Sequence, residues 1–202
     1  MSTSPLPPDF IQHLEALEAA YLSSADPIRQ SGFNGGPERW RAERAPILEA
    51  VPTGGDLLDV GCANGYLAEC LVRWGAERGL ALTPFGVDIS ARLVAIARQR
   101  LPEFAQHFFV ANAWGWVAPR RFQYVYSVFD CVPPALFPAF VSNLLRQVVA
   151  PGGRLILGAY GNQAREQAPA PIDRLLSSLG HRVIGTAVGG VAPMSRFAWM
   201  DA

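Results

Sequence analysis

Leu57-Leu-Asp-Val-Gly-Cys-Ala-Asn-Gly-Tyr-Leu67 is the stretch that decides the fold of this 202-residue chain. Its apolar start, Leu57–Val60, is typical of a short buried strand, and the apolar spacing further on predicts a helix from Gly65 to Arg73. The glycines between them predict a tight turn. They would let a ligand approach the backbone, next to the free N–H groups of a helix N-terminus. A strand, a glycine turn and a helix in this order indicate an open α/β sheet with a ligand site at the turn.

The same alternation of strands and helices continues to the C-terminus. Further strands are expected at 85–89, 107–110, 122–129 and 154–159, with helices after Ser90, at 136–149 and at 172–179. Two last strands, at 182–187 and 196–200, are separated only by a turn that contains Gly189, Gly190 and Pro193. Because a parallel crossover needs a dozen or more residues, this pair must be antiparallel. The pattern predicts five parallel strands and a C-terminal hairpin that places an antiparallel strand at the edge.

The first 53 residues differ from this pattern. Residues 1–8 are expected to be a loose tail, and Asp9 is expected to cap a first helix with Gln12 as its capping-box partner. Pro37 is suited to the first position of a second helix. We therefore predict an N-terminal helical lid, residues 1–53, on a ligand-binding domain, residues 54–202, within one compact domain.

Composition excludes several classes of function. All 17 basic residues are arginine, so lysine-dependent Schiff bases and P-loops are excluded. A formal net charge of zero argues against a nucleic-acid partner. The three cysteines have no metal-ligand spacing, so no metal site is expected. The chain shows neither a signal peptide nor an apolar run long enough to cross a bilayer, which predicts a soluble, cytoplasmic protein without a membrane partner.

Two carboxylates flank the glycine turn. Asp59 lies at the end of the first strand, where it would attract an amine and repel a pyrophosphate; Asp88 lies at the end of the second, where a carboxylate can bind ribose hydroxyls. No arginine adjoins the turn in the sequence, so the pattern describes a ligand with a ribose, a positive charge and no phosphate. Two alternatives are a turn without a ligand and a nicotinamide dinucleotide site, which would need a third glycine where Tyr66 stands.

From Gly54 onward the chain resembles the class I S-adenosylmethionine-dependent methyltransferases. The segment Asp59-Val-Gly-Cys-Ala-Asn-Gly65 is similar to their first motif, with Ala63 in place of the middle glycine. The segment 149–157 and the closing hairpin are also similar to the family. The resemblance implies a Rossmann-like α/β fold: a seven-stranded, mostly parallel sheet with a C-terminal antiparallel hairpin and helices on both faces.

The resemblance also implies S-adenosylmethionine as the cofactor and suggests the residues that bind it. Asp59 would face the methionine amino group, Asp88 the ribose and Ile89 the adenine, while Asn112 would accept a hydrogen bond from the adenine amino group. The full set of expected cofactor contacts is Asp59, Gly61, Cys62, Ala63, Gly65, Asp88, Ile89, Asn112, Ala113 and Phe129.

The function expected from this resemblance is methyl transfer by in-line displacement to a small-molecule acceptor. Asp130, after the fourth strand, is either a general base or the cap of the following turn. His13 is expected on the polar side of its helix. Alternative functions are a cofactor-binding sensor or non-catalytic subunit, and a methyltransferase that acts on protein or RNA. The residues expected to form the substrate site or its lid, some of them with core packing as the alternative, are Tyr21, Phe33, Trp40, Arg44, Trp114 and Tyr160.

Overall fold

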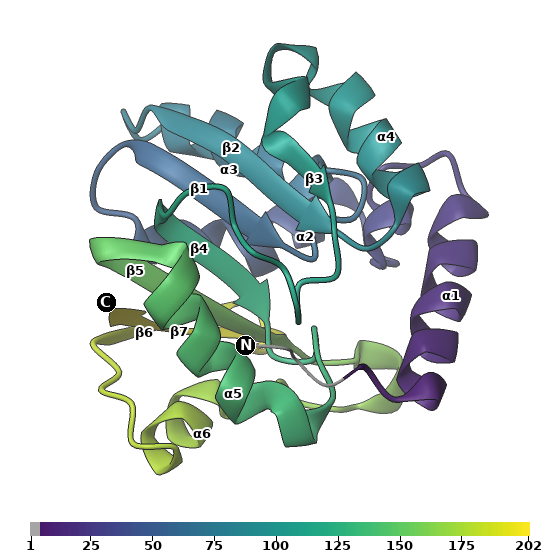
Figure 1. Ribbon diagram of the computed structural model, residues 1–202. Helices are drawn as coiled ribbons and strands as arrows, with labels where there is room; N and C mark the ends of the chain where they lie inside the picture. The colour runs from purple at the N-terminus through teal and green to yellow at the C-terminus, as the bar shows by residue number, and fades with distance from the viewer. Residues whose placement is uncertain (1–4) are drawn as a thin grey trace.

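β1 (Gly55–Val60), the strand that precedes the glycine turn, lies inside a seven-stranded sheet in the computed structural model, which describes residues 5–202 (Figure 1). The strand order is β3-β2-β1-β4-β5-β7-β6. The order reverses direction between β1 and β4, and ligands of open α/β sheets bind at the carboxyl ends of strands beside such a point. The remaining strands are β2 (Leu82–Asp88), β3 (Phe108–Val110), β4 (Phe122–Val128), β5 (Val149–Tyr160), β6 (Gly185–Gly189) and β7 (Ser195–Asp201).

Helices cover both faces of the sheet because successive strand residues point to opposite sides. Leu58 packs in the core on the side of α5 (Phe137–Asn143) and α6 (Ile172–Ser178), whereas Leu57 packs on the side of α3 (Tyr66–Ala76). Figure 1 shows α5 and α6 in front of the sheet and α3 behind it.

Three further α-helices lie within residues 5–202. α2 (Pro37–Arg44) lies on the α3 side, with Pro37 in the first turn as predicted, and α4 (Ala91–Arg100) packs beside α3. Ser90 caps α4, because its hydroxyl accepts a hydrogen bond from the Leu93 N–H. α1 (Pro8–Leu22) stands at the end of the sheet to which β1, β2 and β4 point (Figure 1). Helices from the N-terminal segment are therefore near the predicted ligand-binding edge.

The predicted fold class is confirmed, with a correction at the hairpin. β7 is antiparallel to both β5 and β6 and lies between them, so the antiparallel strand is internal. The strand at this edge of the sheet is β6, and β3 forms the opposite edge. This arrangement gives β7 hydrogen-bonding partners on both sides, and its central residues are buried.

Several predicted boundaries were wrong. The helix expected at 136–149 changes to a π-helical turn at Leu144–Val148, and the strand expected from Arg154 begins at Val149. Residues 151–153, between the predicted helix and the predicted strand, lie at an irregularity within β5, because Phe122 pairs with Val149 and Tyr124 with Arg154.

The N-terminal helix begins earlier than expected. α1 starts at Pro8 after Pro7, and no side chain caps it, so the predicted capping box of Asp9 and Gln12 does not form. Of the tail predicted at 1–8, residues 1–4 lie outside the described residues. Leu6 is buried in the core on the α5 side, so this part of the segment is packed rather than loose.

Candidate active site

The glycine turn brings the backbone after β1 against the end of β2. Gly61 has φ +86° and Gly65 has φ +72°, a region that favours glycine. The N–H groups of Gly61 and Cys62 both donate to the Val87 carbonyl, at 2.8 and 3.2 Å. Ala63, where the related motif has glycine, also has a positive φ of 44°, which costs about 1 kcal/mol for a residue with a Cβ.

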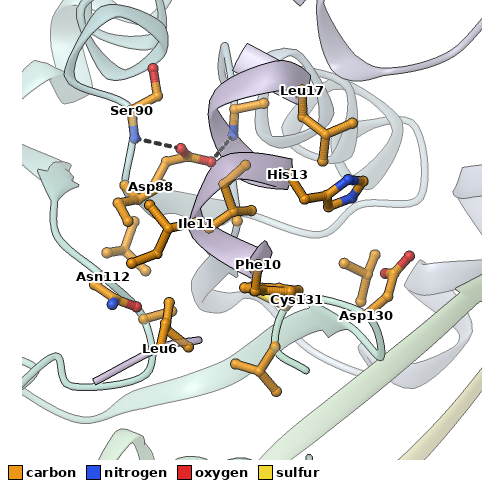
Figure 2. Close-up of a pocket in the computed structure, with 18 of the residues that line it drawn as sticks. Leu6, Phe10, Ile11, His13, Leu17, Asp88, Ser90, Asn112, Asp130 and Cys131 are labelled. Atoms are coloured by element: carbon orange, nitrogen blue, oxygen red, sulfur yellow. Dashed lines mark hydrogen bonds between the residues drawn. The ribbon is translucent and has the colours of Figure 1, made fainter. Parts of the chain in front are cut away.

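Asp88 fixes this turn and retains free hydrogen-bonding capacity. Its Oδ2 accepts a hydrogen bond from the Ala63 N–H at 2.9 Å, and its Oδ1 accepts one from the Ser90 N–H at 2.9 Å (Figure 2). Because a carboxylate has about four acceptor sites, about two remain for a ligand. Burial raises the pKa of this carboxyl, while the two backbone hydrogen bonds act in the opposite direction.

Asp59 lies on the opposite side of the turn in a different environment. Its side chain is buried, and within residues 5–202 it accepts no hydrogen bond. Burial, together with the nearby charge of Asp88, raises its pKa to about 7. A buried carboxylate of this kind favours a cationic ligand, which would stabilise the ionised form.

Two cavities, each of about 680 Å³, meet at the turn. Gly61, Ala63 and Asp130 line both of them, so they mark the junction. The first cavity contains the predicted adenosine-binding residues and Phe129, and the second contains the predicted methionine-binding residues. Residues along the first include Asp88, Ile89, Asn112, Ala113 and Phe129, and residues along the second include Asp59, Cys62, Phe33, Trp40, Arg44 and Tyr160. Tyr21 contributes to both.

Two predicted site residues line neither cavity. Gly65 is buried, and a Cβ there would lie only 2.8 Å from the Ala97 Cβ, so this glycine allows α3 to approach α4. Trp114 is buried in the core on the α5 side. The Trp114 N–H donates to the Asn112 Oδ1 at 3.0 Å, which leaves that oxygen one further acceptor site.

Arg44 corrects the inference that the site lacks a cation. It is buried beside the second cavity, with its guanidinium carbon 4.0 Å from the Trp40 ring centroid and 4.4 Å from that of Tyr160. Its Nη1 lies 3.5 Å from a Glu43 carboxylate oxygen but has no hydrogen-bond partner within residues 5–202. Arg39 lines the same cavity and pairs with Glu43 at 2.6 Å, so the two cavities together offer acidic groups and two arginines.

His13 is the site residue that sequence reasoning missed. It lines the first cavity from α1 and faces the side of the cavity that holds Asp130 (Figure 2). The environment of Asp130 raises the pKa of its carboxyl by desolvation, and the charge of His13 lowers it in part. The signal was present, since His13 lies three residues after Phe10 and four before Leu17, on the apolar face of the helix.

The family model and the relatives that match this chain are all methyltransferases. A family model described as "Methyltransferase domain" matches residues 57–153. The chain is 30% identical over 131 residues to a demethylmenaquinone methyltransferase of Tropheryma whipplei, covering 64% of this chain and 52% of that one. It is 36% identical over 103 residues to a trans-aconitate 2-methyltransferase of Rhodopseudomonas palustris, covering 49% and 38%.

The fold agrees with these matches. A Burkholderia thailandensis 1,6-didemethyltoxoflavin-N1-methyltransferase, solved with bound 1,6-didemethyltoxoflavin and S-adenosylhomocysteine, superposes with a TM-score of 0.64 at 12% identity, covering 99% of this chain and 92% of that one. Residues 57–153 are therefore similar to a methyltransferase domain, and the chain has the fold of the class I S-adenosylmethionine-dependent methyltransferases. It spans 52% of the length of the demethylmenaquinone methyltransferase, and between 38% and 70% of the length of the curated methyltransferases it matches. No helix within residues 5–202 is both long and apolar enough to span a membrane.

The α1 helix lines the first cavity but has no buried residue. Glu18 connects it to the start of α4, where it accepts a hydrogen bond from the Ser90 hydroxyl and pairs with Arg92 at 2.5 Å. The hydrogen bond from Arg92 lowers the pKa of Glu18. Its contribution to stability is therefore present above the pKa of the unfolded chain and is lost as the pH falls through the lowered value.

We expect Glu18→Gln to loosen α1 without unfolding the domain. The pair is largely solvated, so the change in free energy should stay below about 1 kcal/mol. Amide hydrogen exchange should become a few-fold faster across α1 and stay unchanged in α3. Glu15→Gln, on the same helix and exposed, is the matched control. Equal exchange in the Glu18 variant and the wild type would show that this contact does not hold α1.

Proposed function

We propose that this chain binds S-adenosylmethionine across the two cavities and transfers its methyl group to a small molecule. The observation that carries this proposal is the pair of carboxylates, Asp59 and Asp88, on opposite sides of one glycine turn at the junction of the cavities. Their properties fit a ligand with a ribose at one end and an ammonium group at the other.

Each part of the cofactor can be matched to residues that line the two cavities or shape the turn. The free acceptor sites of Asp88 would bind the ribose hydroxyls, and Ile89, Asn112 and Ala113 would surround the adenine. Asp59 would bind the amino group. Arg44, which lines the second cavity, would bind the carboxylate. Gly61, Cys62 and Ala63 would provide the floor beneath the methionine, and Gly65 would act indirectly by allowing the turn.

The cofactor supplies a methyl group that is already activated on a sulfonium, so the protein has mainly to orient the acceptor. Holding two reactants in line can contribute up to roughly 7–11 kcal/mol to lowering the barrier. Asp130 lines both cavities at their junction, which is where an acceptor would meet the methyl group. We assign it to receive the proton from a hydroxyl or ammonium acceptor. Tyr21, Phe33, Trp40 and Tyr160 would enclose the reactants, with residues 1–53 as a lid.

A small-molecule acceptor is supported by the relatives and by the charge of the chain. The two curated relatives are named for demethylmenaquinone and trans-aconitate, both small molecules. The formal net charge of zero provides little attraction for a nucleic acid.

The raised pKa of Asp59 predicts how ligand affinity depends on pH. Its pKa is about 7 in the free protein, and a cation beside it would lower that pKa, so ligand binding should release a proton below pH 7. Affinity for S-adenosylhomocysteine should rise with pH from about 5.5 to 7, by at most about tenfold per unit, because the ligand amino group stays protonated there. Calorimetry in two buffers of different ionisation enthalpy measures the proton release.

The matched variant for this measurement is Asp59→Asn, which removes the titrating group with little change in shape. It should bind more weakly at pH 7 and show a flat pH profile over the same range. A sloping profile retained in Asp59→Asn would assign the proton to another group.

Turnover tests the enzymatic proposal. The purified protein is incubated with S-adenosylmethionine and the low-molecular-weight fraction of a cell extract, and S-adenosylhomocysteine is measured. Formation that requires this fraction supports the proposal. Cofactor binding without turnover in any fraction would instead support a sensor or a non-catalytic subunit.

A further inference from the structure

The first cavity has an apolar wall that the proposed cofactor contacts leave uncovered. The residues proposed to hold the adenine follow β2 and β3, on one side of β1 in the sheet. The wall comes from α5 and α6, which follow β4 and β5 on the other side, and from α1. Figure 2 shows Asp88 and Asn112 well separated from His13 and Asp130. The wall consists of Phe10 and Leu14 of α1, Val132 in the loop before α5, Phe137 of α5, Leu175 of α6 and Leu179 directly after α6.

The charges along this cavity are unfavourable for an anion. The acidic residues of its lining are Glu15, Glu18, Asp88 and Asp130. Among residues 5–202, no arginine lines this cavity. His13 is the one residue of this lining that can carry a positive charge. Glu18 is paired with Arg92, and Asp88 already accepts two backbone hydrogen bonds. An anionic acceptor would therefore lie near the Asp130 carboxylate with little to compensate it.

We propose that the methyl acceptor is an uncharged, largely apolar molecule that packs against the wall formed by α1, α5 and α6. This inference rests on the proposed function, because it uses the cofactor assignment to decide which part of the cavity remains. It specifies the chemical class of the molecule that accepts the methyl group. Burial of apolar surface supplies the affinity, and the acidic lining disfavours carboxylates.

Two probes with the same ring system test the charge preference. Calorimetry first measures binding of S-adenosylhomocysteine alone, and then binding of 2-naphthol or 2-naphthoate to the protein saturated with it. We expect 2-naphthol, uncharged at pH 7, to bind at least about tenfold more tightly than the carboxylate. Equal or tighter binding of 2-naphthoate, or no binding of 2-naphthol, would overturn the inference.

A variant tests the position of the site. Leu175→Arg places a cation on the wall, at a half-buried position of α6. It should weaken 2-naphthol and strengthen 2-naphthoate, each several-fold, while affinity for S-adenosylhomocysteine stays unchanged. Val188→Arg, at an exposed position of β6 outside both cavities, is the matched control. An unchanged probe preference in Leu175→Arg would contradict the wall as the site, whereas a wild-type protein that does not bind S-adenosylhomocysteine would contradict the proposed function itself.

Discussion

Asp88→Ala should weaken the binding of S-adenosylhomocysteine by at least about 100-fold, measured by calorimetry. Two hydrogen bonds from ribose hydroxyls to a carboxylate are each worth about 1.5–3 kcal/mol, and about 1.4 kcal/mol corresponds to a factor of ten. The same substitution removes the acceptors of the Ala63 and Ser90 N–H groups, which adds to the loss because the turn is then less well ordered. Glu49→Ala removes an exposed carboxylate outside both cavities and should bind like the wild type.

A ligand analogue separates the ribose contact from the ordering of the turn. The wild type should bind the 2′-deoxy analogue of S-adenosylhomocysteine about tenfold more weakly than the parent, because one hydrogen bond to the carboxylate is lost. The Asp88→Ala variant should bind the two ligands equally. Affinity of Asp88→Ala within about threefold of the wild type would refute the assignment of the ribose site, and so would retained discrimination against the analogue.

The second large effect concerns stability and the close approach of α3 and α4. Gly65 and Gly79 both have a positive φ, of 72° and 75°. A Cβ on Gly65 would lie 2.8 Å from the Ala97 Cβ and 3.1 Å from its Cα, whereas a Cβ on Gly79 would meet nothing within 4 Å. Alanine at Gly79 therefore costs only the conformational term, about 1 kcal/mol.

Gly65→Ala should cost that amount and about 1–3 kcal/mol more, because Ala97 and the helix that carries it must shift. Free energies of unfolding in urea for the two variants give the difference directly. This loss is a large part of the about 5–15 kcal/mol that stabilises a typical domain. Equal losses in the two variants would mean that the helices can separate freely and that the motif glycine serves only the turn.

The fold and the carboxylate pair were predictable because their signals are local. The apolar run before Gly61 specifies β1, and strand alternation specifies that Asp59 and Asp88 end neighbouring strands. The internal position of β7 was not predictable in this way. A hairpin connection requires only that β6 and β7 pair, and which of them also pairs with β5 depends on packing across the whole sheet.

The second cavity shows why the other site residues were harder to predict from the sequence. Arg44, at the end of α2, approaches Tyr160, at the end of β5, and these two segments are far apart in the chain. Trp114 was predicted near the ligand from its position after Asn112, but its large apolar ring is buried in the core instead. His13 was overlooked for a different reason, since its position on the apolar helix face was visible but no motif marked it.

The most direct test of a small-molecule methyltransferase is the destination of the methyl group. The protein is incubated with methyl-labelled S-adenosylmethionine and a whole extract of the cells from which it comes, and the products are passed through a filter that retains proteins and nucleic acids. We predict that the label passes the filter in a product extractable into organic solvent, and that Asp88→Ala abolishes its formation at low cofactor concentration. Label retained with protein or RNA would contradict the account.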